Sequence, residues 1–143
     1  MLPACAVDIA AHYEVPYELV KAVAQVESSQ RNPGRVGPNS NGTYDLGIMQ
    51  INTWWLERTG PYSISAMGIT EAELLNNDCT NIAVGVWVLK QDLDRYGNVR
   101  AALSAYNTGK PSSNIGLAYA EKVITWSEKY GKARFERGAV AAR

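Results

Sequence analysis

The segment Val15–Ser29, VPYELVKAVAQVESS, has the hydrophobic spacing of an amphipathic helix with an acid out of place near its end. One stripe of the helical wheel holds Leu19, Val20, Val23, Ala24 and Val26, and the opposite side holds Glu18, Lys21 and Gln25. Glu27 follows Val23 by four residues and Val20 by seven, so it is predicted to point along the apolar stripe. A carboxylate there loses water on one flank, which raises its pKa. An acid that stays protonated near neutral pH is what cleavage of a glycosidic bond requires.

Two structural roles compete with catalysis for Glu27. The side chain could lie at the exposed end of the helix, because a helical wheel drifts near a terminus. It could also be a buried acid paired with an arginine such as Arg31 or Arg35. The helix alone leaves the three roles open.

Length and charge narrow the class of protein. A chain of 143 residues is predicted to form a single domain, residues 1–143, with one hydrophobic core. Fourteen basic residues balance fourteen acidic ones without a basic run, so we expect no nucleic-acid partner. No apolar run approaches the length of a membrane span, so no membrane-spanning segment is expected.

The cysteines give two possibilities and argue against a metal. Cys5 and Cys79 lack the close spacing of metal ligands, and with His12 as the single histidine we expect no metal and no cofactor. They are either buried thiols or one disulfide across a long loop, which would imply an oxidising compartment. No signal peptide precedes Cys5, so we expect either a cytoplasmic protein or an exported one whose leader is absent.

The remaining pattern predicts a mainly α protein of the α+β class with one small β-hairpin. Helices are expected at about 4–13, from Pro16 through Glu27, at 81–94, from Asn98 to residue 106, and along the stripe that ends at Tyr130. The dipeptide Asn41-Gly42 predicts a two-residue hairpin turn in a small antiparallel ribbon. The tail from about Ala133 lacks a core stripe and is expected to fray.

Three motifs occur in a fixed order along the chain: Glu27-Ser28-Ser29, Gly47-Ile48-Met49-Gln50-Ile51-Asn52 and Ala105-Tyr106-Asn107-Thr108-Gly109. Together they resemble the pattern of lytic transglycosylases of the soluble-lysozyme-like (SLT) superfamily, over roughly residues 5–130. The resemblance is greatest to the small periplasmic enzymes that accompany type III secretion, type IV secretion and pilus systems. It implies a lysozyme-like fold with the hairpin beside an active-site cleft. It also implies a Cys5–Cys79 disulfide, a periplasmic location and, as a partner, a secretion-system or pilus subunit.

The resemblance implies a reaction on the glycan strands of peptidoglycan. The residue that matches Glu27 donates a proton to the oxygen between N-acetylmuramic acid (MurNAc) and N-acetylglucosamine (GlcNAc). The sugar's own N-acetyl group attacks the anomeric carbon, and the product closes to a 1,6-anhydro sugar. No nucleophile from the enzyme is needed.

The same resemblance assigns a substrate groove. Met49 would supply an apolar contact, Gln50 an amide for the acetamido group, and Tyr106 a hydrogen bond near Glu27. Core packing is the alternative for Met49 and Tyr106. The further residues assigned to the groove are Ser28, Asn52 and Asn107, and the two asparagines could instead cap local turns.

One stretch departs from the transglycosylase pattern. Residues 39–47, NSNGTYDLG, are similar to the hairpin of animal c-type lysozymes, in which the residue that matches Asp45 is the second catalytic carboxylate. Asp45 could therefore stabilise or attack the sugar cation if it lies about 5 to 5.5 Å from Glu27. Alternatively, Asp45 caps the hairpin or pairs with an arginine. Trp54 and Trp55 follow closely and could line a sugar cleft or be buried.

These features predict an enzyme that cleaves the MurNAc-β-1,4-GlcNAc bond, as a lytic transglycosylase with Glu27 as acid and base. A muramidase that hydrolyses the same bond with Glu27 and Asp45 is the enzymatic alternative. A non-catalytic module that binds glycan or a secretion subunit is the alternative from another class. Retention of both carboxylic acids argues against the module, because a desolvated acid is costly.

Overall fold

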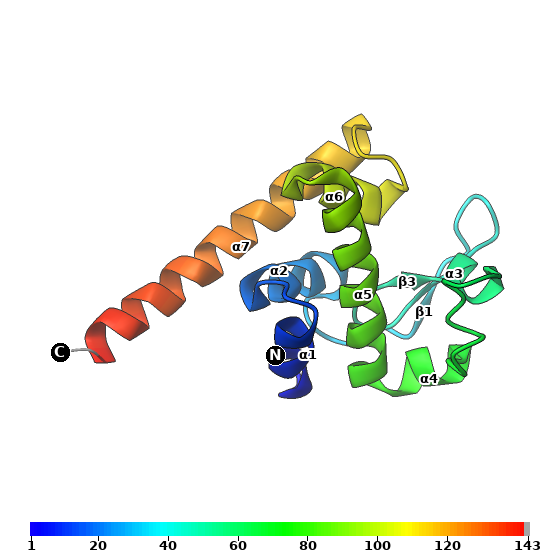
Figure 1. Cartoon of the computed structure of the whole chain (residues 1–143), viewed down its shortest axis with the longest axis horizontal. Coiled ribbons are helices and arrows are strands. Elements are labelled where there is room, and N and C mark those ends of the chain that lie inside the picture. The colour runs from blue at the N-terminus through cyan, green and yellow to red at the C-terminus, as the bar shows by residue number, and fades with distance from the viewer. Residues whose placement is uncertain (142–143) are drawn as a thin grey trace.

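The computed structural model describes the backbone of residues 1–141 and the side chains of residues 1–132. Two helices precede one small sheet in this part of the chain, and the remaining helices follow it (Figure 1). The elements are α1 (Cys5–His12), α2 (Tyr17–Ser28), β1 (Arg35–Val36), β2 (Asp45–Leu46), β3 (Ile51–Asn52), α3 (Trp54–Glu57), α4 (Glu71–Asn76), α5 (Asp78–Tyr96), α6 (Val99–Thr108) and α7 (Asn114–Ala141). The predicted mainly α class with a small antiparallel sheet is confirmed.

The predicted helices form where their capping residues place them. α2 begins after Pro16 and ends at Ser28, because the next residue, Ser29, has a φ of +55° and caps the helix. α5 starts earlier than its hydrophobic repeat, because the Asn77 side chain accepts a hydrogen bond from the Thr80 amide. Asn98 caps α6 as predicted. The short helices α3 and α4 were not predicted.

The sheet has the strand order β1-β2-β3 with both pairs antiparallel. The two-residue turn predicted at Asn41-Gly42 is wrong. Asn39 donates its amide to the Thr43 carbonyl at 2.7 Å, and Gly42 donates to the Asn39 carbonyl at 2.9 Å, so three residues form the loop. Gly42 alone takes a positive φ, +82°, whereas the two-residue turn requires one at Asn41 as well.

Helix packing builds the core on which the sheet rests. α2 packs against α7, α6 packs between α5 and α7, and β3 packs against α5. In Figure 1, α5 runs through the middle, with α1 and α2 on one side and the sheet with α3 on the other. The largest side chains with almost no exposure come from α2, from the segment between β2 and β3, from α5 and from α6, for example Val23, Ile48, Met49, Leu89 and Leu103.

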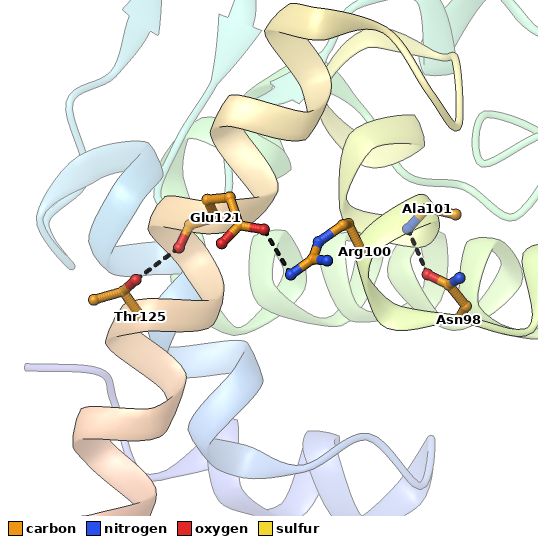
Figure 2. A network of polar contacts seen from close by, with 5 residues as sticks. All are labelled: Asn98, Arg100, Ala101, Glu121 and Thr125. Carbon is orange, nitrogen blue, oxygen red and sulfur yellow. Dashed lines mark hydrogen bonds and ion pairs between the residues drawn. The ribbon is translucent and has the colours of Figure 1, made fainter.

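Polar contacts on the outer surface join α6 to α7. Figure 2 shows Arg100 of α6 reaching Glu121 of α7, with the two side chains 2.6 Å apart at their closest atoms. Thr125 donates its hydroxyl to the Glu121 carbonyl one turn along α7. Both partners of the ion pair are more than half exposed, so the pair adds at most about 1 kcal/mol.

A disulfide joins α1 to the start of α5. Cys5 and Cys79 are bonded across a sequence separation of 74 residues, as the family resemblance implied. A bridge over a loop of that length stabilises the fold by roughly 4 kcal/mol in the chain-entropy model.

No described helix combines the length and apolar character needed to cross a membrane. The backbone of α7 continues through residues 133–141, and the side chains of this tail, for which fraying was expected, lie outside the described residues.

Asn81 of α5 holds the segment between β2 and β3. Its side chain is fully buried, donates to the carbonyls of Leu46 and Leu74, and accepts the amide of Met49 at 2.8 Å. Gly47 packs so closely on this side chain that a Cβ there would overlap the amide. Asn81 therefore fixes residues 46–49 to α5.

Replacement of Asn81 by Ala is expected to lower the free energy of unfolding by about 3 kcal/mol, because it leaves buried backbone groups without partners. Urea denaturation measures the loss. The matched control is Asn76→Ala, at an exposed position, which is expected to change the stability by less than about 0.5 kcal/mol. Equal stabilities of the two variants would contradict the role given to Asn81.

Candidate active site

A cleft of about 780 Å³ runs between the hairpin loop and sheet on one side and α5 and α6 on the other. Six of the residues that sequence analysis assigned to the site line this cleft. They are Glu27, Asp45, Gln50, Asn52, Tyr106 and Asn107. The folded chain thus brings the three sequence motifs to one place, although they are spread over more than half of its length.

Glu27 lies at the end of α2 with its carboxyl group largely shielded from water. Its pKa is raised from 4.5 to about 7, chiefly by burial; a hydrogen bond from Tyr119 acts in the opposite direction, and the negative charge of Asp45 contributes to the rise. The Tyr119 hydroxyl donates to Glu27 Oε2 at 2.9 Å. The acid is thus held protonated near neutral pH, as its place on the helix predicted.

The two structural alternatives for Glu27 do not hold. Among the described residues no ion pair includes Glu27, and Arg35 instead pairs with Glu71 at 3.0 Å. Nor is the side chain at an exposed helix end, because its carboxyl is largely desolvated. An arginine partner would have lowered its pKa.

Ser28 positions the Glu27 helix and does not line the cleft. Its hydroxyl donates to the Ile48 carbonyl at 2.7 Å and lies 3.1 Å from the Ala24 carbonyl. The first contact ties the end of α2 to the segment between β2 and β3. The groove role implied for Ser28 is therefore not supported by its position.

Met49 is a core residue, so the predicted contact between its side chain and substrate is wrong. It is fully buried against α5, where a Cβ on Gly85 would meet its side chain at 2.8 Å. Its carbonyl accepts the Tyr106 hydroxyl at 2.9 Å. Met49 therefore shapes the cleft through its backbone and its packing.

The hydrogen bond expected near Glu27 comes from a different tyrosine. Tyr106 lines the cleft but donates to Met49, whereas Tyr119 of α7 donates to Glu27. Burial, and then the charge of Glu27, raise the pKa of both phenols well above the ordinary value, so both remain protonated donors. Tyr119 was assigned only to a core stripe, but a buried phenol requires a partner for its hydroxyl.

Asp45 faces the cleft from β2 and is held by two amides. Asn39 Nδ2 donates to Oδ2 and Asn52 Nδ2 donates to Oδ1, each at 3.1 Å. The register of the sheet places Asn52 directly opposite Asp45. No ion pair of the described residues includes Asp45, so the arginine alternative does not hold. Asn52 also accepts the Trp54 amide, which is the local turn cap considered for it.

Asp92 of α5 is a third acid in the cleft that sequence analysis missed. Burial raises its pKa to about 6, and the positive charge of Arg95 acts in the opposite direction. The sequence signal for Asp92 was present, because Asp92 follows Val88 by four residues, as Glu27 follows Val23.

Trp54 and Trp55 also line the cleft, and Trp54 is 48% exposed. In the described part of the chain no three metal-ligating side chains gather.

The chain is similar to a known protein family and to several known proteins. Residues 4–127 match the profile of the Transglycosylase SLT domain. The chain is 37% identical to the Invasion protein IagB of Salmonella typhimurium over 124 residues, which cover 85% of this chain and 72% of that protein. It is 34% identical to Protein IpgF of Shigella flexneri over 113 residues, 78% of this chain and 70% of that one.

A phage enzyme and a solved structure are also similar. The Transglycosylase of Enterobacteria phage PRD1 is 34% identical over 117 residues, 80% of this chain and 38% of that protein. The X-ray structure of an inactive mutant of the lytic transglycosylase Slt from Pseudomonas aeruginosa matches with a TM-score of 0.64 at 19% identity. That match covers 91% of this chain but 24% of the other, and it shows the shared lysozyme-like fold. The chain belongs to the SLT family of lytic transglycosylases.

Proposed function

We propose that the protein cleaves the MurNAc-β-1,4-GlcNAc bond of peptidoglycan with Glu27 as its acid and base. The single observation that carries the proposal is the state of Glu27, whose pKa is raised to about 7 in the wall of a cleft. An acid with a pKa near the working pH can both give and take a proton efficiently. Membership of the SLT family supports the choice of peptidoglycan as substrate.

The reaction needs no water and no nucleophile from the protein. Glu27 donates its proton to the glycosidic oxygen as the bond to the anomeric carbon of MurNAc breaks, and the carbonyl oxygen of the adjacent N-acetyl group bonds to that carbon. The Glu27 carboxylate then takes the proton of the C6 hydroxyl, and the C6 oxygen displaces the acetamido oxygen. The product is a 1,6-anhydro sugar, and Glu27 is again protonated.

Asp45 has a supporting electrostatic role in this mechanism. Its carboxylate is oriented by Asn39 and Asn52 and faces the cleft, so its charge can stabilise the positive anomeric carbon. The same charge helps to keep Glu27 protonated. In the alternative function, a muramidase, water attacks the sugar and Asp45 stabilises or forms the intermediate. The observation that favours this alternative is the placement of both acids in one cleft.

A periplasmic location fits the disulfide between Cys5 and Cys79, because such bonds persist in oxidising compartments. The similarity to the Invasion protein IagB supports a task in which the enzyme opens the wall locally for a secretion or pilus apparatus. A subunit of that apparatus is the proposed protein partner.

Mass spectrometry of the products from purified peptidoglycan tests the proposal. We expect muropeptides that end in 1,6-anhydroMurNAc, one water lighter than hydrolysis products. Glu27→Gln is expected to lower the rate at least ~100-fold, because it removes the general acid. Reducing-end products would instead identify a muramidase. Cleavage by Glu27→Gln at the wild-type rate would contradict the mechanism.

The pH dependence of cleavage tests the role of Tyr119. Activity should fall as the pH rises through about 7, where Glu27 loses its proton. The Tyr119 hydrogen bond lowers the pKa of Glu27, so Tyr119→Phe should move this alkaline limb to higher pH. The control is Tyr130→Phe, also on α7, whose hydroxyl bonds Gln25 and Gln30. Identical alkaline limbs in the wild type, Tyr119→Phe and Tyr130→Phe would refute the proposed role of Tyr119.

A further inference from the structure

Arg58 lies immediately after α3 and lines the cleft. Its guanidinium carbon is 5.2 Å from the ring centroid of Trp54, 5.4 Å from that of Trp55 and 5.5 Å from that of Tyr62. Three aromatic rings thus surround one cation. Arginine contacts of this kind are attractive, because the ring faces carry partial negative charge.

The aromatic cluster around Arg58 is anchored to the core of the protein. Trp54 packs edge-on against Trp55 at 5.0 Å between centroids, and Trp55 packs against Trp87 of α5 at 5.8 Å. Tyr62 also lies against Trp87, at 6.5 Å. Because Trp87 belongs to a long helix, these contacts restrict the position of the Arg58 guanidinium before any substrate binds.

The Arg58 guanidinium has ring contacts but no acceptor among the described residues. Other arginines do have acidic neighbours. Arg35 pairs with Glu71, Arg100 pairs with Glu121, and Arg95 interacts with Asp92. Within the described side chains no hydrogen bond or ion pair includes the Arg58 guanidinium. Its five donors are therefore available to a ligand in the cleft.

The charges of the cleft indicate where an anion would bind. Asp45 and Asp92 disfavour an anionic group beside them, and the charge of Arg95 is already balanced in part by Asp92. No ion pair among the described side chains includes Arg58. A glycan strand made of GlcNAc alone is uncharged, whereas MurNAc carries a 3-O-lactyl arm that ends either in a free carboxylate or in a peptide with carboxylates of its own.

We propose that Arg58 binds a carboxylate carried on the lactyl arm of MurNAc, and that it thereby distinguishes peptidoglycan from uncharged glycans. The inference rests on the proposed function and adds a residue that selects the substrate. The planar guanidinium presents two parallel N–H groups to a carboxylate, which a lysine cannot do. Trp54, Trp55 and Tyr62 hold that plane in position.

Binding measurements test the proposal without cleavage. Every protein carries Glu27→Gln, so the ligand is not consumed, and affinity is measured by titration calorimetry. The probes are soluble glycan strands with stem peptides, the same strands after the peptides are removed, and a GlcNAc oligosaccharide of equal length. Arg58→Gln and Arg58→Lys are compared with Arg100→Gln, which removes an arginine outside the cleft.

We expect Arg58→Gln to weaken binding of a carboxylate-bearing strand about tenfold, or about 1.4 kcal/mol. Binding of the GlcNAc oligosaccharide should stay unchanged, Arg58→Lys should recover only part of the affinity, and Arg100→Gln should bind as the parent does. A loss confined to strands with peptides identifies the peptide carboxylates. A loss confined to strands without them identifies the lactyl carboxylate.

Two results would overturn the anion site. One is an equal loss on the uncharged oligosaccharide, which would mean that Arg58 only supports the aromatic cluster. The other is unchanged affinity for both anionic strands. These results are independent of the proposed function. If the enzyme without Glu27→Gln gave no cleavage products while Arg58→Gln still weakened anion binding selectively, the site would stand and the catalytic proposal would fail.

Discussion

The burial of one carboxyl group, that of Glu27, is the constraint on which the site depends. Its pKa of about 7 in the folded chain exceeds the ordinary value of 4.5. As the pH rises between these values, the unfolded chain gives up its proton first, so the free energy of unfolding falls. The loss reaches on the order of 3 kcal/mol. Through Glu27, the folded protein is therefore less stable at neutral pH than at acidic pH. The Tyr119 hydroxyl favours the charged form of Glu27 and so limits this loss of stability.

The segment between β2 and β3 holds the surroundings of Glu27 in place mainly through its backbone. Ser28, Asn81 and Tyr106 come from three different helices, and each bonds a backbone group of residues 46–49. The side chains of Ile48 and Met49 are buried in the core. Ser28 and Tyr106, which sequence analysis assigned to a substrate groove, therefore join α2 and α6 to this segment, and Asn81 joins α5 to it. The cleft itself is lined by the residues on either side of 46–49, Asp45 and Gln50.

The helices and the place of Glu27 were predictable because hydrophobic period and capping residues are local properties of a sequence. The stripe of Val15–Ser29 placed Glu27, and Asn98 capped α6 as expected. The errors arose where the position or burial of a residue depends on contacts with residues distant in sequence. Tyr119 lies 92 residues from Glu27, and no spacing relates the two. Met49 was wrongly assigned to the groove because its burial depends on close approach to Gly85 of α5, which is distant in sequence. The hairpin loop was one residue longer than the Asn41-Gly42 pair suggested, because the pairing of Asn39 with Thr43 sets its length.

The most direct test of the central claim is a measurement of the Glu27 pKa itself. The protein is labelled with ¹³C at the glutamate side-chain carboxyl carbons, and NMR spectra are recorded as a function of pH, with Glu27→Gln used to assign the resonance. Our account predicts a midpoint of about 7. A midpoint near the ordinary glutamate value of 4.5 would contradict it, because Glu27 would then be ionised at neutral pH and unable to protonate the glycosidic oxygen.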